Sequence, residues 1–133
     1  MLRKASRRLT RFYDACMAET GLRTTQYAIL SLLASHGSTT MSALANLLAM
    51  DRATMGHNVR PLERDGLVTI QVGRADRRER EVALTPEGVR VEAHSKPFWL
   101  KAQIGFEAEF GKAEALAMRQ MMAQVVQLEL SAD

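Results

Sequence analysis

Four arginines fall within eight residues of this chain and form its clearest chemical signal. The segment GRADRRER, residues 73–80, carries them together with two acids, Asp76 and Glu79. A guanidinium group presents a rigid fork of N–H donors that fits phosphate oxygens and the edge of guanine. The segment therefore suggests recognition of a polyanion, but an isolated charge run is also typical of a solvated loop. The flanking elements decide between the two interpretations.

The segments on either side of this run alternate between apolar and polar residues. LVTIQV at 67–72 comes before it, and EVAL at 81–84 comes after it. A period of two predicts strands with one buried face, so the arginines lie at the tip of a predicted β-hairpin. The residues expected to face inward are Val68, Ile70, Val72, Val82 and Leu84.

A helix with a polar face is predicted directly before the hairpin. It is expected to run from an N-cap at Asp51 to about Asp65. One side is an apolar stripe of Met55, Val59 and Leu62. The opposite side is expected to be exposed and to present Arg52, Ala53, Gly56, His57 and Arg60, with Thr54 at its flank.

Five further helices are predicted from apolar residues that recur at steps of three and four. They are expected over residues 2–19, 24–35, 41–49 and 86–106 and after Gly111. Thr40 and Thr85 are the expected N-caps of the third and fourth, and the fourth is expected to break near Gly105. HGSTT at 36–40 is an expected connector. The short third helix is expected to direct toward the core Leu44, Leu47 and Leu48.

This order of elements predicts a mainly α fold with a small β-hairpin wing. A short helix, a tight turn, a second helix and a hairpin are typical of a winged helix-turn-helix, whose second helix enters the major groove of DNA. The 133 residues suffice for one domain with its own core and are too few for two of ordinary size. Double-stranded DNA is therefore the expected partner.

Three stretches carry a resemblance to a known family: GLRTTQYAILSLL, MSALANLLAMDRATMGHNVRPLERDGLV and DRREREVALTPEG. On these residues the chain resembles the MarR family of bacterial transcription regulators. The resemblance implies a homodimer that binds a palindromic operator, and a repressor that small aromatic or phenolic effectors release from DNA. Within a single domain spanning 1–133, it implies a winged helix-turn-helix lobe at about 24–85 and a helical dimerisation region formed by about 1–20 and 86–133.

The exposed helix supplies the first set of expected DNA contacts. Thr54 and His57, in its first turns, are expected near base edges, and Arg52 and Arg60 near phosphates or guanine. Further DNA-binding residues are expected to be Ala53 and, at the start of the preceding helix, Thr40 and Ser42. The hydroxyls of these last two can donate to phosphates or serve helix capping alone.

The wing supplies the second set. The resemblance implies that Asp76 and Arg78 belong to the family's wing motif, and we expect their pairing to hold the loop in one shape. Arg74 or Arg77, nearer the tip, is then expected to enter a narrow minor groove, whose negative potential attracts arginine. The sequence does not decide which of the two arginines does so.

Three positions depart from the family pattern. Relatives usually carry threonine and arginine where this chain has Gly56 and His57, which implies a different operator. They also carry threonine in place of Arg23, where it forms a capping box with Gln26. Because an arginine side chain cannot accept a hydrogen bond there, Thr24 is the expected substitute cap.

Five residues are expected near a cleft between the winged lobe and the dimerisation helices. Four are aromatic and could line a pocket for an aromatic effector, and one is cationic and could bind an anionic one. They are Tyr13, Tyr27, Phe98 and Trp99, and Arg23. Packing within the core or the dimer is the alternative role for the aromatic residues.

The remaining signals are weak or exclude functions. Cys16 raises the alternative of a redox-sensing regulator, but its place on an apolar stripe favours buried packing. The three histidines are scattered, so no metal site is expected, and no motif indicates a cofactor or an enzyme. No apolar run reaches the ~18 residues of a membrane span, and no secretion signal is recognisable, so a cytoplasmic protein is expected. A constitutive DNA-binding or architectural protein without an effector stays open as an alternative.

Overall fold

The computed structural model of the chain describes residues 1–132, and Asp133, which ends the expected 86–133 region, lies outside the described residues. The fold is mainly helical with a small antiparallel sheet, as the sequence predicts. In chain order the elements are α1 (Leu2–Met17), the short 3-10 helix η1 (Ala18–Thr20), α2 (Thr24–His36), β1 (Thr39–Thr40), α3 (Met41–Leu47), α4 (Arg52–Arg64), β2 (Val68–Val72), β3 (Arg80–Leu84), α5 (Pro86–Phe110) and α6 (Lys112–Gln127).

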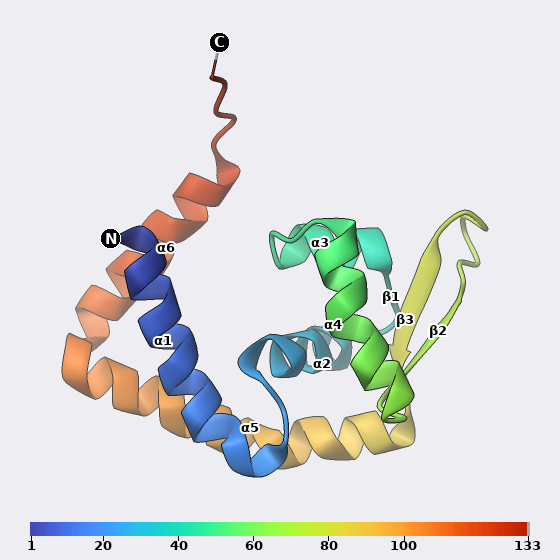
Figure 1. The fold of residues 1–133 in the computed structure, drawn as a ribbon, viewed down its shortest axis with the longest axis horizontal. Helices are drawn as coiled ribbons and strands as arrows, with labels where there is room; N and C mark the ends of the chain where they lie inside the picture. Colours follow the sequence, from blue (N-terminus) through green and yellow to red (C-terminus); the bar gives the residue numbers. More distant parts are fainter. Residues whose placement is uncertain (133) are drawn as a thin grey trace.

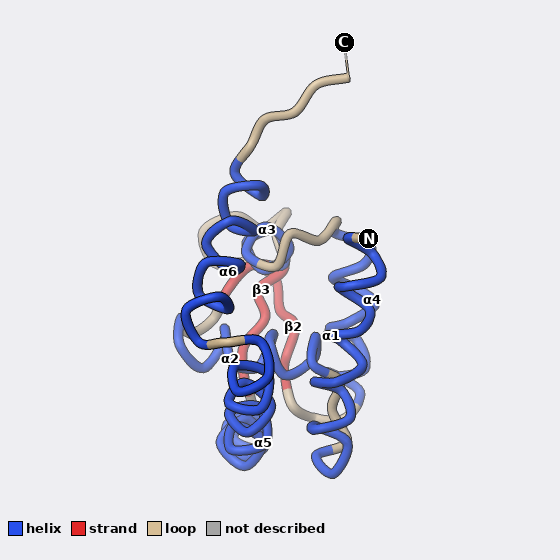
Figure 2. Tube along the Cα trace, turned by 90° about the vertical axis from the view of Figure 1, so that its left-hand side faces the viewer, coloured by secondary structure: helices blue, strands red, loops and turns tan. Residues whose placement is uncertain are grey.

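The long helix α5 is the base on which the other elements are arranged (Figure 1). The sheet lies at its first turns, whereas α6 follows its far end and α1 packs along it. Helix α2 packs against both α5 and α4 and so joins the two parts of the molecule. The wing points away from α5, α3 lies on the side of the lobe opposite α5, and the chain after α6 extends away from the body (Figure 1, Figure 2).

Short polar side chains fix the starts of three helices. Thr40, Asp51 and Thr85 each accept a hydrogen bond from the backbone N–H three residues later, over 3.1, 2.7 and 3.0 Å. Each bond satisfies an amide that has no partner inside its own helix. The three predicted N-caps of α3, α4 and α5 are thereby confirmed.

The sheet has three strands in the order β1-β3-β2, one more than the predicted hairpin. The added strand β1 pairs Thr39 with Val82 and Thr40 with Glu81. It lies inside the expected connector at 36–40, because two residues are too few to show a period of two. Val72 is 46% exposed, so the expectation that it faces inward is wrong. The hairpin extends beyond the core at this end.

The core lies between α2, α3, α4 and the sheet. The predicted stripe of Met55, Val59 and Leu62 is fully buried and packs in one cluster with Leu44. Leu47 was expected to join them but is 53% exposed. Helix α3 ends at this residue, so its side chain lies at the surface instead of over the core.

Helix α5 runs unbroken from Pro86 to Phe110, so the expected break near Gly105 is wrong. A Cβ at Gly105 would lie 3.2 Å from the Phe12 ring, which is tighter than ordinary packing. The glycine therefore permits the close approach of α1. A glycine required by a neighbouring helix and a glycine that ends a helix look alike in sequence.

The start of α2 differs from the expectation as well. Arg23 is the N-cap residue, and its backbone N–H donates to the Gln26 side chain over 3.0 Å. Thr24 is the first helical residue and does not act as the cap. Asp14 of α1 accepts from both the N–H and the hydroxyl of Thr24, over 2.8 and 2.7 Å. The acceptor at this helix start therefore comes from another helix.

Alanine at Gly88 and alanine at Gly56 should change stability in opposite directions. A Cβ at Gly88 would overlap the Leu67 carbonyl, whereas one at Gly56 would make ordinary contact at 3.6 Å with the Arg60 side chain. We expect Gly88→Ala to destabilise the fold by about 3 kcal/mol or more through overpacking. We expect Gly56→Ala to stabilise it by about 0.5–1 kcal/mol, because alanine favours helix.

Urea unfolding of the two variants measures both effects, and each glycine serves as the control for the other. Equal stability of the two variants would contradict the assignment of Gly88 as a site of close backbone approach.

Candidate DNA-binding site

The exposed face of α4 presents the polar residues expected to reach DNA. Residues with exposed positions on this helix are Arg52, Ala53, Thr54, His57 and Arg60. Gly56 is buried, so its expected exposure is wrong. The guanidinium of Arg60 lies over this glycine, which explains the burial. The face therefore combines two guanidinium groups, an imidazole and a hydroxyl, and all of these groups can donate hydrogen bonds.

The two hydroxyls at the start of α3 have different roles. Thr40 caps the helix, as described above. The Ser42 hydroxyl donates to both carboxylate oxygens of Glu79, over 2.8 and 3.0 Å. Ser42 therefore contacts the wing in this structure, and of the two residues it is Thr40 that caps the helix.

The wing loop is closed by backbone hydrogen bonds around Gly73. The Gly73 N–H donates to the Glu79 carbonyl over 2.8 Å, and the Glu79 N–H donates to the Asp76 carbonyl over 3.0 Å. A Cβ at Gly73 would lie 2.5 Å from the same Asp76 carbonyl. Only glycine fits this close approach, so the residue that opens the charged run also shapes it.

Asp76 and Arg78 form the predicted pair at the tip of the wing. One carboxylate oxygen of Asp76 accepts from the Arg78 backbone N–H at 3.0 Å and from its Nε at 3.1 Å, and the other accepts from Nη2 at 3.1 Å. These hydrogen bonds hold the pKa of the Asp76 carboxyl below its ordinary value, and the bond to the Arg78 side chain contributes most. An exposed ion pair thus braces the loop. The pair acts through its two-pronged geometry rather than through burial.

The four wing arginines, Arg74, Arg77, Arg78 and Arg80, all have exposed positions. The base of the wing lies close to the start of α4, because Arg52 Nη2 is 3.7 Å from a carboxylate oxygen of Glu79 there. The wing and the start of α4 therefore meet at this contact and form a surface with exposed cationic groups. Polyanion binding is the chemistry that such a surface can perform.

Glu79 is the residue of this site that the sequence did not single out. It is the side chain through which the wing contacts both α3 and α4. Its bond to Ser42 is short and charge-assisted, whereas the Arg52 pair is long and more exposed, so the Ser42 bond is the stronger tie. The only signal was an acid within an arginine run, and its partner Ser42 lies 37 residues earlier in the chain.

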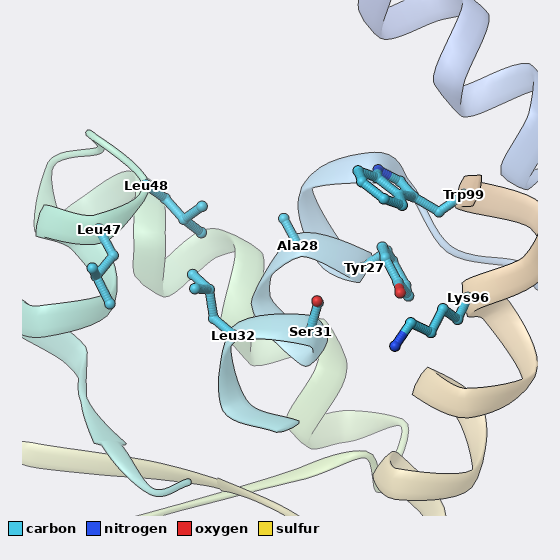
Figure 3. A pocket seen from close by; sticks show the side chains of 8 residues that line it. All are labelled: Tyr27, Ala28, Ser31, Leu32, Leu47, Leu48, Lys96 and Trp99. Carbon is cyan, nitrogen blue, oxygen red and sulfur yellow. The ribbon is translucent and has the colours of Figure 1, made fainter. Parts of the chain in front are cut away.

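A pocket of about 340 Å³ lies between α2, α5 and the end of α3 (Figure 3). Its lining is mostly apolar, and Tyr27, Ser31 and Lys96 bring polar atoms toward one end (Figure 3). The Tyr27 and Trp99 rings stack with centroids 6.2 Å apart. Burial, and then the negative charge of Glu92, raise the pKa of the Tyr27 hydroxyl.

Of the five residues expected to line one pocket, Tyr27 and Trp99 line this one. The Tyr13 ring lies beside them, with its centroid 6.5 Å from that of Trp99. Tyr13 donates from its hydroxyl to Gln103 over 2.7 Å and lies on α1, and burial raises its pKa. Arg23 is the exposed N-cap of α2. Phe98 lines a separate hollow on the far side of α5. The cation of the pocket is Lys96, which sequence reasoning missed because a lone lysine gives no pattern.

Cys16 lies beside Phe98 in that separate hollow, of about 360 Å³. The thiol residue is half-buried, so the expectation of full burial on the apolar stripe is only partly met. Lys101 lines the same hollow.

The helices at the far end of α5 expose a large amount of apolar surface. Exposed large apolar residues of α6 and the segment after it are Leu116, Met121, Met122, Val125, Val126, Leu128 and Leu130. Met121 and Val125 are more than half exposed on α6. Patches of this extent on one chain are typical of a protein–protein interface.

Within residues 1–132, no three His, Cys, Asp or Glu side chains gather closely enough to hold a metal ion. No helix in that part of the chain combines the length and the apolar character needed to cross a membrane.

The fold and this surface define a winged helix-turn-helix protein, and comparisons with known proteins agree. The family model described as MarR family matches residues 22–79. MosR from M. tuberculosis, solved in complex with DNA, is 30% identical; the match covers 96% of each chain with a TM-score of 0.77. A probable transcriptional regulator from Pseudomonas aeruginosa is 27% identical, with 93% and 92% of the two chains covered and a TM-score of 0.82.

Bordetella bronchiseptica BpsR, whose DNA binding is regulated by 6-hydroxynicotinic acid, shares the fold at 24% identity. The match covers 96% of this chain and 91% of BpsR with a TM-score of 0.82. None of the curated proteins matches the sequence significantly. The chain belongs to the MarR family and is a transcription regulator with a DNA-binding winged helix.

The Arg78→Ala variant should raise the pKa of Asp76. The pKa of this carboxyl is depressed in the folded protein because Arg78 donates to its charged form. The ion pair therefore orders the loop at pH values above the ordinary aspartate pKa. It is lost as the pH falls through the depressed pKa of Asp76 in the folded protein. An NMR titration of the side-chain carboxyl carbons measures the midpoint.

Arg77→Ala is the matched control, because Arg77 lies in the same loop without contacting Asp76 in any hydrogen bond or ion pair found within residues 1–132. An Asp76 midpoint that moves equally in both variants would show that net charge, and not the pair, depresses the pKa.

Proposed function

We propose that this chain is a ligand-responsive transcriptional repressor that binds a palindromic operator as a homodimer. The winged lobe at about 24–85 reads DNA, and the segments at about 1–20 and 86–133 form the dimer. The observation that carries the proposal is the contact between Arg52 and Glu79, which joins the start of α4 to the base of the wing. A protein arranged in this way can place α4 in a major groove and the wing in the adjacent minor groove at once.

In this proposal α4 reads base edges with Thr54 and His57, from its first turns. Arg52 and Arg60 contact phosphates or guanine, and Ala53 packs against the same strand. Thr40 and Ser42, at the start of α3, contact the DNA backbone. The side chains concerned on α4 are exposed, which supports the assignment.

The wing contributes Arg74 or Arg77 to the minor groove, with Asp76 and Arg78 as the brace. A braced loop loses less conformational freedom on binding than a mobile one, so the ion pair favours binding although it brings a negative charge. The hydrogen bonds of Asp76 to three Arg78 donors support this role.

A homodimer would cover the apolar surface of α6 and the segment after it. An interface of standard size removes about 800 Å² from each partner, and it is richest in apolar residues at its centre. The extension of the chain after α6 away from the body supports a partner on this side, because its leucines otherwise lie in water (Figure 1).

The pocket between α2, α3 and α5 is the proposed effector site. Stacked Tyr27 and Trp99 suit an aromatic ring, and Lys96 suits an attached anionic or phenolic oxygen. BpsR, which responds to a small aromatic acid, has the same fold and supports an effector of this class here. We infer that the protein acts in the cytoplasm, where the DNA is, and has no enzymatic activity.

Two other functions are weighed against this one. A constitutive DNA-binding or architectural protein would bind DNA without any response to small molecules, and the pocket with its cation disfavours it. A redox-sensing regulator would use Cys16, which has a half-buried thiol beside Lys101. A lone thiol without a second cysteine in the chain gives this alternative less support.

Selection of bound duplexes from a random-sequence library tests the operator. We expect a palindrome whose half-sites lie about one helical turn, ~10 bp, apart, because each subunit reads one. Sedimentation of the free protein should give a dimer. The His57→Ala variant should change the selected bases more than it changes affinity for unrelated DNA.

A non-palindromic selected sequence, or a monomer in sedimentation, would contradict the proposal. Equal loss of affinity for operator and unrelated DNA in His57→Ala would exclude base reading by His57. Glu87→Gln, on the first turn of α5 beside the C-terminal end of α4 and away from its first turns, is the control variant.

Small aromatic carboxylates should raise the melting temperature of the protein and lower its affinity for the selected operator. The same compounds with a neutral amide in place of the carboxylate should act less, because Lys96 then lacks an anionic partner. In Lys96→Met the difference between acid and amide should disappear. Lys101→Met, on the separate hollow, is the matched control.

If the carboxylates raised the melting temperature of Lys96→Met as much as that of the unaltered protein, the anion would bind elsewhere. If none of them affected operator binding, the constitutive function would replace the ligand-responsive one.

A further inference from the structure

The Glu79 carboxylate contacts Ser42 and Arg52, two of the residues that the proposed function assigns to DNA. The carboxylate accepts both contacts of the Ser42 hydroxyl and lies 3.7 Å from Arg52 Nη2. The backbone of Glu79 closes the wing loop at Gly73 and Asp76. The carboxylate is therefore fixed from both sides, and its side chain is only 26% exposed.

A phosphate and this carboxylate need the same donors. A serine hydroxyl has one hydrogen, so Ser42 cannot donate fully to Glu79 and to a phosphate oxygen together. The guanidinium of Arg52 has more donors, but a carboxylate beside it lowers the positive potential that a phosphate meets. The two anions therefore exclude or weaken one another at this place.

We propose that Ser42 and Arg52 form one phosphate-binding site and that Glu79 is its internal competitor. The carboxylate must move away before a backbone phosphate enters, so it lowers affinity for any DNA. This inference rests on the proposed function and names a control of its binding site. It makes the two acids of the charged run opposite in effect: Asp76 favours binding through Arg78, and Glu79 opposes it.

The Glu79→Gln variant separates this role from a purely mechanical one. Glutamine keeps the length of the side chain and an acceptor for Ser42, so a tie that only positions the wing would survive. It removes the charge that competes with phosphate. We expect affinity for a duplex of unrelated sequence to rise about three- to five-fold, the scale of one exposed charge interaction.

The salt dependence gives a second readout that a mechanical role does not move. One additional neutralised phosphate steepens the slope of log affinity against log salt by about 0.9. In Glu79→Gln with Arg52→Ala, the gain in both affinity and slope should vanish. This non-additivity identifies Arg52 as the group that Glu79 withholds.

Glu81→Gln is the matched control, because it removes the same charge two residues away. Glu81 contacts the Ser38 hydroxyl and the Arg74 backbone instead of Ser42 and Arg52. We expect it to change affinity and slope less than Glu79→Gln. Equal gains in the two variants would show a general charge effect and overturn the inference.

Unchanged or weaker DNA binding by Glu79→Gln would also overturn it. If that variant proved unstable in thermal unfolding, Glu79→Ala serves in its place and is likewise expected to bind DNA more tightly. Failure of the proposed function looks different: the unaltered protein would then show no salt-dependent DNA binding at all, whatever residue occupies position 79.

Discussion

The close junction between the end of α4 and the start of α5 is the constraint on which the arrangement of the molecule depends. The Thr85 N–H donates to the Leu67 carbonyl over 3.0 Å, and its hydroxyl donates to the Gly66 carbonyl over 2.6 Å. Gly88 lets the first turn of α5 lie directly on the Leu67 carbonyl. Because α5 also carries α1 and leads into α6, these few contacts set the direction of α4 relative to the opposite end of the molecule.

Local features of the sequence predicted most of this fold. Caps such as Asp51 and the buried stripe of α4 depend on residues within one or two turns, so periodicity and capping rules find them. The errors arise where a distant segment decides. Gly105 lies inside a helix and leaves room for Phe12 of another helix, and Asp14 completes the start of α2 from another helix. Strand β1 exists only because β3 lies beside it.

The same division applies to the candidate site. Asp76 and Arg78 lie two positions apart in the chain, and the sequence showed both partners. Glu79 stands in the same run, but its partners lie on α3 and α4, so no local pattern distinguished it from a solvating charge. An acid in an arginine-rich segment can thus hold an arginine in place, or it can occupy a neighbouring hydrogen-bond donor that a phosphate would otherwise use. Which role it takes depends on groups that only the folded chain brings near.

Helix α3 contacts both the proposed effector pocket and the wing. Leu47 and Leu48, at its end, line the pocket, and Ser42, near its start, binds Glu79. A helix of seven residues is too short to bend smoothly, so a displacement at one end moves the other. A ligand that binds to one position of α3 more tightly than to another would shift α3 toward that position, by a free energy equal to the difference in binding. The contact between Ser42 and Glu79 would change with it. In the proposed function, α3 is therefore the element through which an effector in the pocket would act on the DNA-facing surface.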